Sequence, residues 1–182
     1  MENETKVKRL EHRSVYQGRV LTLEVDRVIE PSGIEVEREV VRHVGAAVIL
    51  AITGEQRLVL VRQFRYAVGE FLWEIAAGHI APGETPEETA RRELVEETGF
   101  FPQHLEKLSA FYPSPGFSDE TMHLFLATDL EQRSPCPEED ESIEVGFFTM
   151  EEILSMVSRA EIRDGKTLLG LMLLKNREAP TF

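Results

Sequence analysis

The stretch "GHIAPGETPEETARRELVEETGF", residues 78–100, carries the clearest pattern in this sequence of 182 residues. Its second half predicts a helix whose two ends are both marked. Thr85 stands at the N-cap position, Pro86 follows it, and Glu88 completes a capping box. Gly99 is typical of a left-handed cap at the C-terminal end. We therefore expect one capped helix between Thr85 and Gly99.

Three glutamates of this helix, Glu93, Glu96 and Glu97, fall within five residues. At helical spacing they share nearly one face, where like charges destabilise a helix by a few tenths of a kcal/mol per pair. Ala90 and Leu94, one turn apart, mark the opposite, buried side. A solvated surface is the common explanation for a glutamate-rich helix. The glycine- and proline-containing loop before it favours a site for hard divalent cations, which choose oxygen ligands.

The rest of the chain predicts an α+β fold with a mixed sheet, helices packed over it and an N-terminal ribbon of strands. Expected strands cover residues 19–29, 34–43, 45–52, 57–64, 121–130 and 143–149, and further helices cover 149–160 and 166–176. The helix at residues 166–176 is expected to serve in packing. His104 is expected in a connecting loop.

Composition excludes several classes of function. The net charge of −13 argues against nucleic acid and against an anionic membrane surface, because both require basic patches. No apolar run reaches the ~18 residues of a membrane helix, and the polar N-terminus does not resemble a secretory signal. The single cysteine, Cys136, cannot form an internal disulfide and suits a reducing compartment. We therefore expect a cytoplasmic protein.

Residues 78–100 resemble, with no departure, the box of the Nudix hydrolases, G-x5-E-x7-R-E-U-x-E-E-x-G-U, where U is apolar. The fixed positions are Gly78, Glu84, Arg92, Glu93, Glu96, Glu97 and Gly99. The resemblance implies a Nudix-type α/β/α sandwich with a mixed β-sheet over residues 44–182. The strand ribbon of residues 1–43 precedes this domain.

The resemblance further implies a metal site for Mg²⁺, with Mn²⁺ or Zn²⁺ able to substitute. Its ligands would be one backbone carbonyl and three carboxylates, those of Ala77, Glu93, Glu96 and Glu97. Arg92 would act in catalysis by orienting a ligating glutamate through an ion pair, and Glu84 would support the loop.

A second stretch, "YPSPGFSDETMHLF" at residues 112–125, resembles the ADP-ribose pyrophosphatase branch, with Pro115 sixteen residues after Gly99 (115 − 99 = 16). An ordinary turn is the alternative explanation. The resemblance implies a substrate loop at Pro115 and Gly116. It gives Glu120 the role of general base or of an additional metal ligand, and the sequence does not separate these two.

Two further residues match substrate contacts of that branch, and two more are candidates on the N-terminal strand ribbon of residues 1–43, which in that branch is exchanged across a homodimer. Arg65 would contact the diphosphate, Glu74 a sugar or the adenine, and Arg38 and Arg19 the adenine. The implied reaction is hydrolysis of ADP-ribose to AMP and ribose 5-phosphate. A pyrophosphatase for another nucleoside diphosphate sugar, such as GDP-mannose, is the nearest alternative. A non-catalytic nucleotide sensor is disfavoured by the intact box and by the negative charge.

Overall fold

The structure is a computed structural model that describes residues 7–134 and 142–178, so Cys136 lies outside the described residues. The chain divides into two compact units. One comprises the residues up to Gly45 together with Tyr112–Thr121, and the other comprises the rest of the chain. The substrate loop predicted from the sequence thus belongs to the same unit as the N-terminal strands.

The first unit is built on a three-stranded antiparallel sheet with the order β1-β2-β3. Its strands are β1 (Lys8–Gln17), β2 (Leu21–Ile29) and β3 (Glu35–His43). The alternating patterns of β2 and β3 predicted these two strands. Strand β1 lies within the ribbon predicted for residues 1–43, but its own bounds were not predicted, because register shifts between Arg9 and Glu11 and between Ser14 and Tyr16 break its period of two.

The second unit is built on a seven-stranded mixed sheet. The path β10-β5-β4-β9-β8 forms its body, while β6 pairs with β5 and β7 pairs with β4. Among the described strands, β4 and β9 form the parallel pair, and the other neighbours are antiparallel. The strands are β4 (Ala46–Ile52), β5 (Leu58–Arg65), β6 (Glu70–Glu74), β7 (Ala76–His79), β8 (Phe100–Phe111), β9 (Met122–Gln132) and β10 (Glu144–Phe148).

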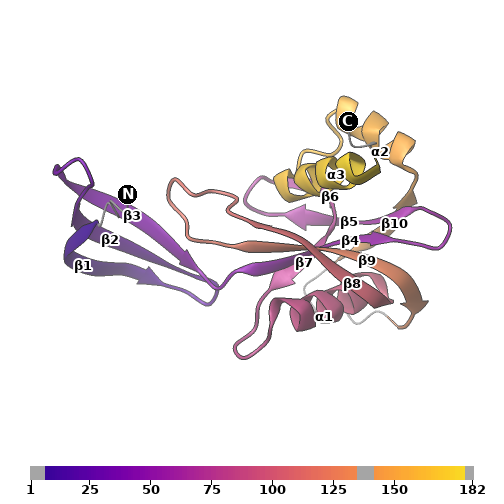
Figure 1. Cartoon of the computed structure of the whole chain (residues 1–182), viewed down its shortest axis with the longest axis horizontal. Helices are drawn as coiled ribbons and strands as arrows, with labels where there is room; N and C mark the ends of the chain where they lie inside the picture. Colours follow the sequence, from indigo (N-terminus) through magenta and orange to yellow (C-terminus); the bar gives the residue numbers. More distant parts are fainter. Residues whose placement is uncertain (1–6, 135–141, 179–182) are drawn as a thin grey trace. The chain divides into compact units, whose positions relative to one another are not determined.

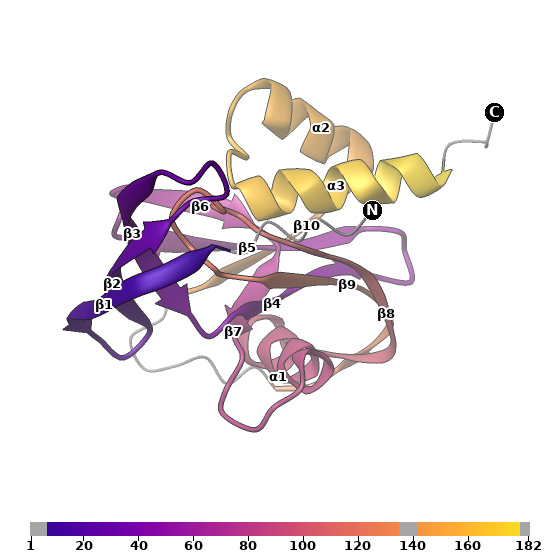
Figure 2. The ribbon, with the colours of Figure 1, turned by 60° about the vertical axis from the view of Figure 1, so that its left-hand side comes forward.

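Helices cover both faces of this sheet, with α1 on one face and α2 and α3 on the other (Figures 1 and 2). Strand β4 sends alternate side chains to the two layers. Ile49 packs in a core with Leu94 of α1, whereas Leu50 packs in a second core with Ile153 of α2 and Leu171 of α3. The continuous apolar run of β4 is explained by this double burial. The predicted α/β/α sandwich is confirmed, with helices α1 (Pro86–Thr98), α2 (Met150–Ser158) and α3 (Gly165–Glu178).

One element was predicted wrongly. His104 does not lie in a connecting loop but in β8, where it pairs with Thr128 of β9. Strand β8 is the last strand of the sheet path, and it contains Pro102 and two charged residues, Glu106 and Lys107. Proline and charge are tolerated on an edge strand because one side of it needs no ladder hydrogen bonds. These residues hide the alternating pattern that would have revealed the strand.

Candidate active site

Helix α1 begins and ends where the sequence predicted. The amide of Glu88 donates to Thr85 Oγ1 at 3.3 Å, and the amide of Thr85 donates to Glu88 Oε2 at 2.8 Å. Gly99 closes the helix with a φ of 74°, the left-handed conformation that glycine adopts without strain. Ala90 and Leu94 are fully buried against the sheet. The rotation of the helix is therefore fixed, and so is the direction of its glutamate face.

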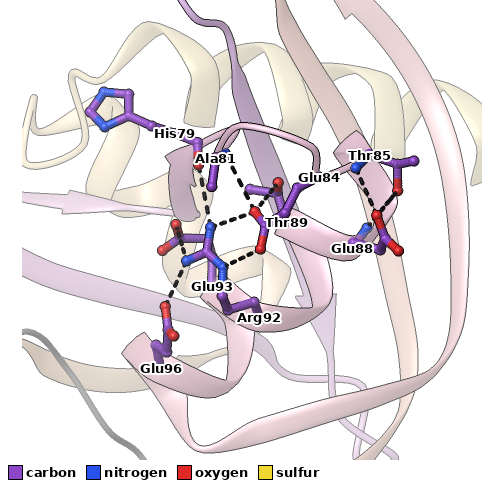
Figure 3. Close-up of polar contacts among 9 residues, drawn as sticks. All are labelled: His79, Ala81, Glu84, Thr85, Glu88, Thr89, Arg92, Glu93 and Glu96. Atoms are coloured by element: carbon purple, nitrogen blue, oxygen red, sulfur yellow. Dashed lines mark hydrogen bonds and ion pairs between the residues drawn. The ribbon is translucent and has the colours of Figure 1, made fainter. Parts of the chain in front are cut away.

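Arg92 is the centre of a carboxylate cluster on that face (Figure 3). Its Nε and Nη2 donate to the two oxygens of Glu84, each at 2.9 Å. Its Nη1 donates to Glu93 Oε1 at 2.7 Å and to Glu96 Oε2 at 2.8 Å, and Nη2 also donates to the carbonyl of His79 at 3.3 Å. One cation thus offsets the repulsion that the sequence predicts between Glu93 and Glu96.

Glu84 fixes the loop that precedes α1. Besides its two bonds from Arg92, its Oε2 accepts hydrogen bonds from Thr89 Oγ1 at 2.8 Å and from the amide of Ala81 at 3.4 Å. The guanidinium of Arg92, followed by the Thr89 hydroxyl, lowers the pKa of the Glu84 carboxyl to about 2. Glu84 is therefore ionised at any physiological pH, and its expected role in supporting the loop agrees with these contacts.

The carboxylates of α1 reach strand β7. A Cβ atom on Gly78 would lie 1.9 Å from Cδ of Glu93, so only glycine leaves room for that side chain. Glu97 is 5% exposed, and its Oε2 accepts a hydrogen bond from the amide of Ala77 at 3.3 Å. The residues predicted as metal ligands, Ala77, Glu93, Glu96 and Glu97, are thus on α1 and the strand beside it. The metal role itself stays a prediction.

Arg65 and Glu74 form a bidentate pair, with Arg65 Nε to Glu74 Oε1 at 2.8 Å and Nη2 to Oε2 at 2.7 Å. Lys166 also contacts Glu74 Oε2, and its Nζ lies 3.0 Å from Asp164 Oδ1. Burial raises the pKa of Glu74, but Arg65 and Lys166 together lower it below its ordinary value. At 1% exposed, Glu74 is the buried counterion of two cations. A direct contact between Glu74 and substrate stays a prediction.

Arg65 lies close enough to Glu97 for this carboxylate to help raise its pKa, after the larger effect of the hydrogen bonds to Glu74. Sequence reasoning missed Lys166, because the run "IRDGKTLLGLML" was read for packing. The signal that could have revealed it is the pair of charges, Asp164 and Lys166, shortly before the apolar run of residues 168–174.

Thr167 joins this helix to the strands beneath it. Its hydroxyl accepts a hydrogen bond from the amide of Ile75 at 3.0 Å and donates to Asp164 Oδ2 at 2.5 Å. Ile75 lies where the chain passes from β6 to β7 and has no ladder position of its own. The Thr167 hydroxyl therefore supplies the partner that a buried amide requires.

The other predicted residues belong to the first unit. Pro115 and Gly116 lie in an exposed turn, in which the carbonyl of Ser114 accepts hydrogen bonds from the amides of Phe117 and Ser118, at 3.2 and 3.0 Å. The expected turn is present, and its contact with substrate stays a prediction.

Three more predicted residues occupy separate places in this unit. Glu120 follows the turn, and its Oε1 lies 3.6 Å from Nδ1 of His43. Arg38, on β3, donates from Nε to Glu30 at 2.8 Å. Arg19 is exposed in the turn between β1 and β2, and this turn lies at the His43 end of the β2–β3 register. Arg38 is in the middle of β3, so the structure does not bring the two arginines together.

A second group of possible metal ligands lies on the ribbon, where donor atoms of His12, Glu24 and Asp26 are within 4.8 Å of one another. Arg42 compensates both carboxylates, with Nε 2.7 Å from Glu24 and Nη2 3.5 Å from Asp26. His12 Nδ1 lies 2.7 Å from Asp26 Oδ1, and this hydrogen bond is the main cause of the lowered pKa of Asp26. The two carboxylates of this group therefore already share a cation, the guanidinium of Arg42.

Within the described parts of the chain, no helix is long and apolar enough to cross a membrane. The NUDIX domain family matches residues 41–169. The chain is 41% identical to an ADP-ribose pyrophosphatase of Bacillus subtilis (strain 168), over 94% of each chain. It is 38% identical to a methanol dehydrogenase activator of Bacillus methanolicus, again over 94% of each.

A crystal structure of an ADP compounds hydrolase superimposes with a TM-score of 0.83, covers 94% of both chains and shares 22% of residues, which supports the fold. Nudix hydrolases generally use divalent metals, and the all-oxygen donor set on α1 suits such ions. On this sequence match, the capped helix and the carboxylate cluster around Arg92, the chain belongs to the Nudix hydrolase family.

Proposed function

We propose that the protein hydrolyses the pyrophosphate bond of ADP-ribose. Water adds to one phosphorus, the bridging oxygen leaves with the other phosphate, and the products are AMP and ribose 5-phosphate. The observation that carries this proposal is the carboxylate cluster around Arg92, held against β7 where Gly78 leaves room for Glu93. The similarity to an ADP-ribose pyrophosphatase over nearly the whole chain supports the choice of substrate.

The site suits a divalent ion, proposed as Mg²⁺, with Mn²⁺ or Zn²⁺ able to substitute. Glu93, Glu96, Glu97 and the carbonyl of Ala77 would hold it, and all of these donors are oxygen atoms, as hard cations require. When bound, the ion neutralises diphosphate charge and lowers the pKa of a coordinated water. Arg92 orients Glu93 and Glu96 through its shared Nη1.

Other side chains would bind substrate and move the proton. Arg65 uses Nε and Nη2 on Glu74, so Nη1 is the nitrogen we assign to the diphosphate. Glu120 takes the proton of the attacking water or serves as an additional ligand. Pro115 and Gly116 would form the substrate loop, with Arg38 and Arg19 assigned to the adenine.

The assembly is proposed to be a homodimer formed through the N-terminal strands, in a cytoplasmic protein. The support is that three apolar residues of β1, Leu10, Val15 and Tyr16, are 39%, 48% and 58% exposed. A three-stranded ribbon is too small to bury both of its faces by itself.

A substrate panel tests the reaction. The protein is incubated with ADP-ribose, GDP-mannose, other nucleoside diphosphate sugars and a dinucleoside polyphosphate, with Mg²⁺ or with chelator. Release of nucleoside monophosphate is followed in each case. We expect the highest kcat/KM with ADP-ribose and no turnover in chelator. A higher kcat/KM with GDP-mannose would reject the proposed substrate, and no turnover of any compound would favour a nucleotide sensor.

A further inference from the structure

The loop 112–121 is hydrogen-bonded to strand β3, in the same unit. The amide of Val41 donates to the carbonyl of Phe117 at 2.7 Å, and the amide of Asp119 donates to the carbonyl of Val41 at 3.2 Å. These bonds form a parallel bridge between Val41 and Ser118. The loop is therefore attached to the ribbon by its backbone on both sides of Ser118.

The side chain of Asp119 adds two more bonds to the same strand. Its Oδ1 accepts from the amide of His43 at 2.9 Å, and its Oδ2 accepts from Arg42 Nη1 at 3.2 Å. Arg42 is itself held by Glu24 and by the buried Asp26. Asp119 is thus the point at which the loop joins the ion network of the ribbon.

Charge alone does not explain this attachment. The side chain of Asp119 is 43% exposed, and an ion pair in such a place contributes about 0–1 kcal/mol to stability. The geometry is more informative, because the two oxygens bond to donors of consecutive residues, Arg42 and His43. This arrangement fixes the direction of the loop on the strand as well as its distance.

Glu120 follows directly, and its backbone is held by a neighbouring side chain. Its amide donates to Ser118 Oγ at 3.1 Å, and its Oε1 lies 3.6 Å from His43 Nδ1. That nitrogen accepts a hydrogen bond from the amide of Gly45 at 3.1 Å, so it presents a lone pair and not a proton. The direction of the Glu120 carboxylate therefore depends on the backbone that Asp119 holds.

We infer that Asp119 is a positioning residue that sets the orientation of Glu120 by clamping the loop to Arg42 and His43. The inference rests on the proposed function, in which Glu120 acts in catalysis. Asp119 does not act in catalysis itself, because both of its carboxylate oxygens are bonded to β3. It acts on the reaction only through Glu120.

A double-mutant cycle separates positioning from a general structural effect. The variants are Asp119→Ala, Glu120→Gln and both together, measured on the best substrate of the panel. Misplacing a reacting group by about 1 Å costs roughly 10²-fold in rate. We expect Asp119→Ala to lower kcat about 10- to 100-fold with KM changed less than about threefold. In the Glu120→Gln background the same change should cost less than about twofold.

Two further variants serve as a second test of the clamp and as a control. Asp119→Asn keeps an oxygen for the His43 amide and loses only the acceptor for Arg42, so it tests the clamp if the alanine variant does not fold. A smaller loss, about tenfold, is expected. Glu35→Gln removes an exposed ion pair with Arg27 on the same ribbon and should leave kcat unchanged. Hydrogen exchange at the amides of Val41 and Asp119 should accelerate only in the Asp119 variants.

Each outcome has one meaning. Asp119 variants with parental kcat, or with the same loss in the Glu120→Gln background, overturn the inference while the proposed function stands. A Glu120→Gln variant with full kcat removes Glu120 from the mechanism, and the inference falls with it. Preference for another nucleotide sugar rejects the proposed substrate alone, because the cycle on that sugar still tests Asp119.

Discussion

Gly78 and Glu93 occupy adjoining space so closely that a Cβ atom on residue 78 would lie 1.9 Å from Glu93 Cδ and 2.3 Å from its Oε2. The atoms in the way belong to the end of a flexible side chain. A methyl group at position 78 is therefore accommodated by moving Glu93 and not by moving the strand. The fold and the site respond differently to the same substitution.

Gly78→Ala should keep the fold and lose the reaction. We expect kcat/KM to fall about 10²-fold or more, because a ligating carboxylate displaced by about 1 Å no longer meets its target, with a small change in Tm. The matched control is Gly54→Ala, where a Cβ meets nothing within 4 Å. Full activity of the Gly78 variant would remove Glu93 from the site.

Metal binding should appear as thermal stability. A ligand that binds only the folded state stabilises it by about 2.7 kcal/mol at a hundredfold excess over Kd. Mn²⁺ should therefore raise the Tm of the parent above its value in chelator, and Glu93→Gln should gain much less. Glu87→Gln, an exposed glutamate on the same helix outside the cluster, is the control and should gain as much as the parent. Equal gains in both variants would argue against a metal site at Glu93.

The sequence predicted local features of the site well, and its long-range contacts poorly. Thr85 and Gly99 end a helix through chemistry within a few residues, so their roles could be derived without the fold. The attachment of Asp119 to Arg42 joins residues 77 positions apart. No periodicity reveals such a contact. The edge strand β8 was missed for a related reason. It tolerates a proline and charged residues because it has no neighbouring strand on one side, and that position in the sheet cannot be read from the sequence.

The cluster around Arg92 also corrects the expected energetics. From the sequence, three neighbouring glutamates suggest repulsion before any metal binds, with Arg92 expected to pair with only one of them. In the structure, Arg92 bonds to both Glu93 and Glu96, so the repulsion is largely offset. The charge of Arg92 was visible in the sequence, but the side to which its long side chain turns depends on Glu84, which lies in the preceding loop.

Glu84 should give the protein a recognisable acid sensitivity. Its pKa is about 2 in the folded protein and near 4.3 in an unfolded chain. Because the folded-state pKa is depressed, the stabilisation is complete above about pH 5 and is lost as the pH falls toward 2. Glu84→Gln should therefore melt below the parent at pH 7, and the difference in Tm should shrink as the pH falls toward 2. A constant difference over that range would contradict the assigned contacts.

The proposed dimer depends on the apolar side chains exposed on β1. Leu10→Glu with Val15→Glu places two charges on this surface, and buried unpaired charges are unfavourable at an interface. Sedimentation at micromolar concentration should show a dimer for the parent and a monomer for this variant. Arg13→Glu, on the same exposed strand, is the control. A parent that sediments as a monomer with full activity would reject the dimer.

Lys166 should be a stability determinant of the second unit. It is 9% exposed and shares the buried carboxylate of Glu74 with Arg65. Lys166→Met removes one of the two cations that contact the buried carboxylate of Glu74. Breaking a buried ion pair in this way costs about 3 kcal/mol of stability. Urea unfolding should therefore show a lower midpoint with an unchanged m-value.

Two comparisons decide whether this cost comes from the uncompensated charge. Lys175→Met removes an exposed lysine of the same helix and should cost only a few tenths of a kcal/mol. Adding Glu74→Gln to Lys166→Met removes the negative charge that the loss of Lys166 leaves with one cation in place of two. Part of the lost free energy of unfolding should therefore be recovered. If the double variant is less stable than Lys166→Met by the full effect of Glu74→Gln, the two residues are not coupled. Lys166 would then stabilise α3 by packing alone, as its place in an apolar run first suggested.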